Sequence, residues 1–160
     1  MSTWRDRLEG GAPFVIAHRG YSGRAPENTL PAFEAAIEAG APALELDVRL
    51  TKDRVPIVFH DATLDRTTNG SGRIDAHDWE EVSKLDAGAW FGPAFAGARV
   101  PLLETALAML ADRVLINIEL KPDGFDAAPP PDAPAHQVAH LVHTLRLEEQ
   151  VVVSWARRCV

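Results

Sequence analysis

The sequence is poor in cysteine, in long apolar runs and in basic charge. Its 160 residues include one cysteine, Cys159, which excludes a disulfide within the chain and fits a reducing compartment. Sixteen Lys and Arg against 23 Asp and Glu give a net charge of −7. That charge disfavours non-specific binding to nucleic acid or to an anionic membrane surface. The first apolar run, residues 14–17, is too short for a signal peptide or a membrane span, so we expect a cytoplasmic protein without an integral membrane segment.

The remaining composition, 46% apolar and 24% charged, is that of a globular protein, and we expect a single domain over residues 1–160. Short apolar strands alternate with helical patterns, which predicts an α/β fold with a barrel or a doubly wound sheet. Strands are expected at residues 14–17, 43–50, 55–60 and 114–120 and from 151 onward, and helices at 28–40, 102–111 and 135–147. Residues 61–100 are predicted to form an irregular insertion, and residues 123–134 a Pro-rich surface loop.

Only four residues, 51–54, separate the second strand from the third. A parallel crossover needs a dozen or more residues, so we predict a hairpin-like reversal at this point.

Polar residues alternate with apolar ones along two of these strands. Glu45 and Asp47 share one face of their strand, and Asn117, Glu119 and Lys121 share one face of another. Carboxylates gathered inside a barrel or wound sheet would repel one another, and a divalent cation relieves that repulsion. Oxygen ligands favour Mg²⁺ or Ca²⁺. The alternative is an exposed sheet face with solvated carboxylates.

Histidines and fixed cations lie at the ends of the same strands. His18 and His60 are candidates for a general acid and a general base, and Arg19 and Lys121 suit an anionic oxygen such as that of a phosphoryl group. The alternatives are structural histidines and plain ion pairs with the carboxylates.

These residues lie within a series of motifs across residues 14–122 that resembles the glycerophosphodiester phosphodiesterase family. The motifs are His18-Arg19-Gly20, Glu27-Asn28-Thr29, Glu45-Leu46-Asp47-Val48, Thr51-Lys52-Asp53, His60-Asp61, Leu64-Asp65-Arg66-Thr67-Thr68-Asn69-Gly70-Ser71-Gly72, Pro101-Leu102-Leu103-Glu104 and Ile118-Glu119-Leu120-Lys121.

The resemblance implies a (β/α)8 TIM-barrel phosphodiesterase that hydrolyses a glycerophosphodiester to glycerol 3-phosphate and an alcohol. It implies a divalent metal, Mg²⁺ or Ca²⁺, on Glu45, Asp47 and Glu119, and an acid/base pair of His18 and His60. It further implies phosphate contacts from Arg19 and Lys121, with Glu27 and Asn28 shaping the loop over the site. The alternatives are a catalytically inactive fragment that keeps these ligands, and a lysophospholipid phosphodiesterase.

The sequence departs from the family pattern at two places. Arg54 stands at a turn position where the family usually has glycine, and the match ends at Trp155. A complete barrel of this type usually takes about 250 residues. We therefore expect a C-terminally incomplete barrel with about its first five strands, as in a fragment of a longer gene. The strand at residues 151–153 would then offer an open edge for self-association.

Three histidines near the C-terminus of the chain have a spacing that places them on one face of a predicted helix. His136, His140 and His143 fall on the helix face opposite Val138 and Leu145, so we expect them to be exposed to solvent rather than to bind a metal.

Overall fold

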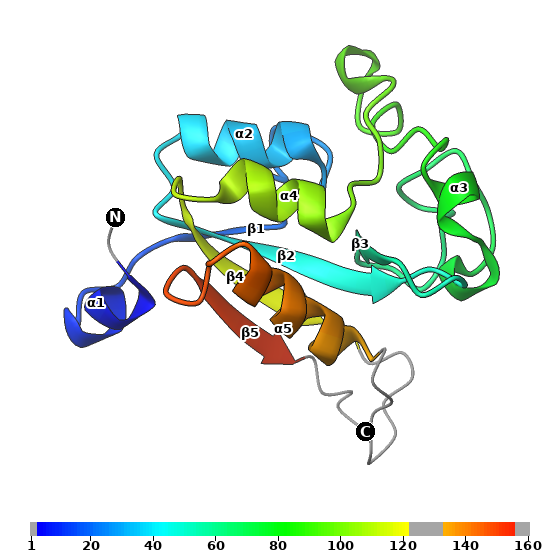
Figure 1. The fold of residues 1–160 in the computed structure, drawn as a ribbon. Helices are drawn as coiled ribbons and strands as arrows, with labels where there is room; N and C mark the ends of the chain where they lie inside the picture. The colour runs from blue at the N-terminus through cyan, green and yellow to red at the C-terminus, as the bar shows by residue number, and fades with distance from the viewer. Residues whose placement is uncertain (1–2, 122–132, 156–160) are drawn as a thin grey trace, which may run out of the picture.

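The computed structural model describes residues 3–121 and 133–155. Its core is a sheet with the strand order β1-β2-β4-β5, in which every neighbouring pair is parallel (Figure 1). The strands are β1 (Ile16–His18), β2 (Ala43–Leu50), β4 (Leu115–Leu120) and β5 (Val151–Trp155). Each parallel strand therefore lies beside the next parallel strand of the chain, and all their carboxyl ends meet at one edge of the sheet.

The third strand, β3 (Pro56–Val58), runs antiparallel to the end of β2, with Val48 opposite Val58. The tight link between them turns at Arg54, which has a φ of 65°. This confirms the predicted reversal, because the five residues between the two strands are too few for a crossover. It also confirms that the arginine occupies a backbone conformation that glycine adopts more easily.

Three helices cover one face of the sheet. They are α2 (Leu30–Glu38), α4 (Leu103–Leu110) and α5 (Pro134–Thr144), with α2 and α4 side by side over β2 and α5 along β4 and β5 in Figure 1. Helix α2 begins at the predicted position, where the Thr29 side chain accepts a hydrogen bond from the Ala32 amide. The apolar face of the strands packs under these helices in one buried cluster that includes Phe33, Leu44, Leu46, Leu103, Leu107, Ile116, Ile118 and Val138. The other face is left for the polar residues.

A short N-terminal helix, α1 (Trp4–Glu9), was not expected from the polar start of the chain. Trp4 is buried with Ala43 and Leu115, and its indole Nε1 donates hydrogen bonds to the carbonyl oxygens of Ile116 (3.2 Å) and Gln150 (2.9 Å). One aromatic residue thereby closes the polar face of the sheet at the amino ends of the strands.

Residues 61–100 contain the 3-10 turns η1 (Ile74–Ala76) and η2 (Pro93–Phe95) and the short helix α3 (Trp79–Val82). They form a second apolar cluster around the buried side chains of Ile57, Leu64, Ile74 and Val82. The segment with α3 lies beyond the carboxyl end of β2 (Figure 1).

Several predicted boundaries need correction, since β1 spans Ile16–His18 rather than 14–17 and β3 spans Pro56–Val58 rather than 55–60. Most of the predicted loop at 123–134 lies outside the described residues, but Pro134 is the first residue of α5, where proline is well tolerated. The same helix ends at Thr144 rather than at residue 147. The three histidines of this helix are exposed as predicted, while Val138 is buried. In the described ranges, no helix combines the length and the apolar character that a membrane span requires.

Candidate active site at the carboxyl ends of the strands

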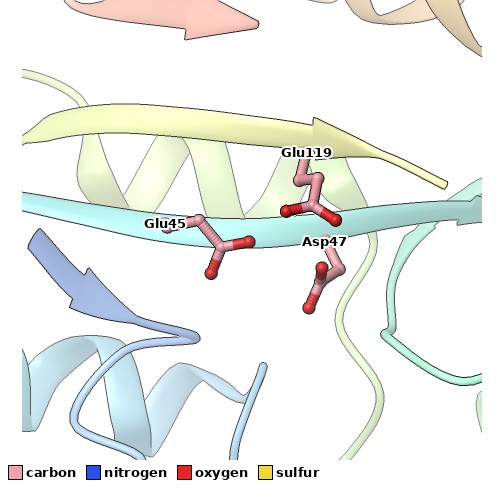
Figure 2. A group of neighbouring side chains, drawn as sticks. All are labelled: Glu45, Asp47 and Glu119. Carbon is pink, nitrogen blue, oxygen red and sulfur yellow. The ribbon is translucent and has the colours of Figure 1, made fainter. Parts of the chain in front are cut away.

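Three carboxylates converge on the polar face of the sheet. Glu45 and Asp47 lie on β2, and Glu119 lies on β4 directly opposite Asp47 (Figure 2). One oxygen from each lies within 4.8 Å of the others, and Glu45 and Asp47 are only 5% and 0% exposed. The shared face predicted from strand alternation is therefore confirmed, and the alternative of an exposed, solvated face is wrong.

Two cationic side chains contact this acidic group. The Lys121 Nζ lies 2.6 Å from Asp47 Oδ1 and also bonds Glu119 Oε1. The Arg19 Nε lies 3.3 Å from Asp47 Oδ2, and the Arg19 backbone amide donates a hydrogen bond of 3.0 Å to Glu45 Oε2. In the described ranges, Arg19 and Lys121 contact the carboxylates directly, and the charge of Arg49 also acts on Asp47. The ion pairs with carboxylates that the sequence left as an alternative are present here.

Of the three carboxylates, Glu45 has the least of its negative charge offset by neighbouring positive charges. Its burial, followed by the charges of Asp47 and Glu119, raises its pKa to about 7. Its Oε1 is buried and has no hydrogen-bond partner within the described ranges. The same holds for Oδ1 of Asn117, which lies opposite Glu45 on β4. A buried group of carboxylate oxygens, one of them without a hydrogen-bond partner, has the chemistry that a hard divalent cation requires.

The loop between β1 and α2 supports the site through two unusual backbone conformations. Arg19 and Asn28 have φ values of 58° and 56°, and the Asn28 amide donates to the Arg19 carbonyl oxygen. The Asn28 side chain then donates a hydrogen bond of 2.7 Å to Asp47 Oδ2. Gly20, with a φ of 77°, packs so closely that a Cβ would lie 2.7 Å from the Ala32 backbone. These conformations bring the loop directly onto the carboxylates.

The two histidines stand at the ends of strands that pair with β2, the central strand of the acidic group. His18 ends β1, and its Nε2 lies 3.9 Å from Glu45 Oε2, with 65% of its side chain exposed. His60 follows Phe59, whose amide donates a hydrogen bond of 2.9 Å to the Asp47 carbonyl oxygen. The Nδ1 of His60 lies 2.6 Å from Asp61 Oδ1.

Sequence reasoning missed Arg66, which joins two parts of the site. Its guanidinium binds both Asp61 and Glu27, and Glu27 also binds Arg19. The pKa of Asp61 is held well below its ordinary value, mainly by the hydrogen bonds from Arg66. Burial raises the pKa of Glu27, but the hydrogen bonds from Arg66 and Arg19 outweigh it and lower that pKa. The partners Arg66 and Glu27 are 39 residues apart, so no local spacing could have indicated the contact.

Fold and site together define an α/β protein of the barrel class, with three carboxylates that could hold a metal ion at the carboxyl ends of its parallel strands. Residues 18–157 match the model of the glycerophosphoryl diester phosphodiesterase family, and the chain belongs to that family.

Named relatives agree with this placement. The chain is 45% identical over 141 residues to a glycerophosphodiester phosphodiesterase of Caldanaerobacter subterraneus, covering 88% of this chain and 56% of the relative. The crystal structure of a glycerophosphodiester phosphodiesterase from Agrobacterium tumefaciens superimposes with a TM-score of 0.79 at 40% identity, covering 88% and 56% of the two chains. An Oleispira antarctica phosphodiesterase, solved with the product sn-glycerol-3-phosphate, superimposes with a TM-score of 0.80 at 32% identity, covering 94% and 60%.

The chain therefore spans little more than half the length of these proteins. The predicted fold, the first part of a (β/α)8 barrel, is confirmed.

Proposed function

We propose that this chain carries the metal and phosphate sites of a glycerophosphodiester phosphodiesterase, which releases glycerol 3-phosphate and an alcohol from its substrate. The observation that carries the proposal is the convergence of Glu45, Asp47 and Glu119 within 4.8 Å, at the strand ends where barrel enzymes place their chemistry. The family membership, and the product named for the Oleispira antarctica relative, support the choice of substrate class.

The carboxylates of Glu45, Asp47 and Glu119 would hold a divalent ion, Mg²⁺ or Ca²⁺. The unpaired Oε1 of Glu45 and the convergence of three carboxylate oxygens support this assignment. When bound, such an ion supplies Lewis-acid polarisation of a phosphoryl oxygen. Lys121 would then be shared between the carboxylates and the substrate, because its Nζ already lies at the edge of the cluster, 2.6 Å from Asp47.

The other residues would bind phosphate and move protons. Arg19 and Lys121 present cationic groups on the polar face and suit the phosphate oxygens. His18 and His60 would form the acid/base pair, with one accepting the proton of the attacking hydroxyl and the other protonating the leaving alcohol. Asp61 supports this role for His60, because a carboxylate at Nδ1 holds the ring in one orientation and leaves Nε2 for the substrate. Glu27 and Asn28 would hold the loop that carries Arg19.

The test is release of glycerol 3-phosphate from glycerophosphocholine by the purified 160-residue chain, with Mg²⁺, Ca²⁺ or EDTA. We expect EDTA to abolish turnover and His18→Ala to lower it by about 10²- to 10⁴-fold. Because the His18 side chain is largely exposed, the variant should unfold like the parent chain. The exposed His140→Ala serves as the matched control and should keep full activity.

Other outcomes of this assay decide between the alternatives. A folded chain without turnover favours a non-catalytic fragment that retains the ligands. Preferential turnover of lysophosphatidylcholine favours a lysophospholipid phosphodiesterase. Appearance of a cyclic glycerol phosphate before glycerol 3-phosphate means that the substrate's own hydroxyl attacks first, whereas direct attack by water gives no cyclic species.

We also propose that the 160-residue chain, studied alone, self-associates through β5. In the described ranges β5 pairs with β4 on one side, and the side chain of Val153 is about half exposed. Sedimentation of the parent chain should show a concentration-dependent oligomer that Val153→Lys shifts to monomer, because a charged edge residue blocks strand pairing. Leu8→Lys, at an exposed position of α1, is the control. A monodisperse parent monomer with a cooperative melt would contradict this proposal.

A further inference from the structure

The guanidinium of Arg66 lies between two carboxylates from separate loops. Its Nε and Nη2 donate to Asp61 Oδ2 and Oδ1 at 2.7 Å and 3.0 Å. Its Nη1 and Nη2 donate to Glu27 Oε2 and Oε1 at 2.8 Å and 2.7 Å. Arg66 therefore binds both carboxylates in a bidentate manner, with Nη2 shared between them. Only the planar fork of arginine supplies this set of donors.

Each of the two carboxylates also contacts a residue of the proposed site. Asp61 Oδ1 lies 2.6 Å from His60 Nδ1, and Glu27 Oε1 accepts a hydrogen bond of 2.8 Å from Arg19 Nη1. These contacts form one continuous path that runs through His60, Asp61, Arg66, Glu27 and Arg19. It joins the histidine proposed to transfer a proton to the arginine proposed to bind phosphate. Arg66 lies at the centre of this path. Among the described residues of the path, only Arg66 contacts both Asp61 and Glu27.

The exposure of the Arg66 side chain indicates that these ion pairs position the neighbouring side chains more than they stabilise the fold. The Arg66 side chain is 45% exposed, whereas the side chains of Glu27 and Arg19 are 14% and 17% exposed. Ion pairs with such an exposed partner contribute little to folding. A carboxylate on one ring nitrogen of a histidine, by contrast, decides which nitrogen carries the proton.

We propose that Arg66 is a positioning residue. It holds Asp61 against His60, so that neutral His60 carries its proton on Nδ1 and leaves Nε2 to exchange a proton with the substrate. Through Glu27 it also fixes the guanidinium of Arg19. The expected effect on turnover rests on the function proposed above, whereas the protonated nitrogen of His60 is observable without any turnover.

The direct test is the ¹⁵N chemical shifts of the His60 ring in its neutral form. The parent chain should show one tautomer, protonated at Nδ1. Arg66→Met should show a mixture of tautomers, and so should Arg66→Lys, because a lysine cannot bridge both carboxylates with a fork. In Asp61→Asn, Arg66 is expected to take the amide oxygen and leave the amide nitrogen facing Nδ1, which moves the proton to Nε2. Arg73→Met, which removes a comparable bidentate pair with Asp75, should leave His60 unchanged.

Kinetics provide the second measurement. Arg66→Met should lower kcat about 10- to 100-fold, with a melting profile close to that of the parent chain. If the parent chain is inactive, the proposed function fails, and the tautomer comparison still decides the role of Arg66. If Arg66→Met does not fold, Asp61→Asn tests the same contact. A His60 tautomer that is unchanged in Arg66→Met, or in Asp61→Asn where the former does not fold, would overturn the inference.

Discussion

Replacing Glu45 with glutamine should stabilise the metal-free protein at alkaline pH. Glu45 is 5% exposed, and its burial, followed by the charges of Asp47 and Glu119, raises its pKa from 4.5 to about 7. The folded state therefore binds this proton more tightly than the unfolded chain does. The associated stability is complete below pH 4.5 and is lost as the pH rises through about 7. At about 1.4 kcal/mol per pKa unit, the loss is roughly 3 kcal/mol.

The assay is thermal and chemical unfolding in EDTA between pH 5 and pH 8. Relative to the parent chain, Glu45→Gln should gain roughly 3 kcal/mol between these limits, which is about 6–12 °C in Tm for a chain of this size. Glu149→Gln, at an exposed position, should follow the parent chain. Added Mg²⁺ or Ca²⁺ at pH 8 should stabilise the parent chain more than Glu45→Gln. Identical pH profiles for the parent chain and Glu45→Gln would refute the reasoning, because Glu45 would then ionise in the fold without penalty.

Three further substitutions test the packing of the core, the ion pair of Asp61 with Arg66 and the turn at Arg54. Phe33→Ala, at a fully buried position of α2, should lower the free energy of unfolding by about 3–5 kcal/mol in denaturant titration, whereas exposed Leu8→Ala should change it by less than about 0.5 kcal/mol. The pKa of Asp61 is lowered in the fold, so its stabilisation is present above pH 3.8 and is lost as the pH falls below that value. Because its partner Arg66 is largely exposed, Asp61→Asn should flatten the acid side of the stability profile only modestly, by about 1 kcal/mol or less; an acid limb that is steeper in Asp61→Asn than in the parent chain would contradict this sign. Arg54→Gly should stabilise the protein by about 1 kcal/mol because φ is 65°, while Lys52→Gly, where φ is not positive, should destabilise it.

The sequence was sufficient for the strands and for the acidic group, because both depend on local periodicity. Alternation with period two placed Glu45 and Asp47 on one face and Leu44 and Leu46 under the helices, as the structure has them. The four-residue link predicted the antiparallel β3 from chain length alone.

The features that the sequence did not reveal depend on contacts between distant residues. Trp4 closes the amino end of the sheet by donating to carbonyl groups more than 100 residues away, and nothing in a polar N-terminus indicates such a contact. Arg66 stood within a recognised motif, but its bond to Glu27 exists only because the fold brings two loops together. The ion pair of Lys121 with Asp47, which the sequence offered only as an alternative to phosphate binding, depends on the register of β4 against β2.

Calorimetric titration of Mg²⁺ and Ca²⁺ into the EDTA-stripped chain tests the central claim most directly. The parent chain should bind one ion of at least one of these metals. Glu119→Gln should weaken that binding by more than tenfold while retaining the fold, since its side chain is only partly buried. Glu104→Gln, at an exposed position of α4, should bind like the parent chain. A folded parent chain that binds neither metal, or a Glu119→Gln variant that binds as tightly as the parent, would contradict the proposed metal centre.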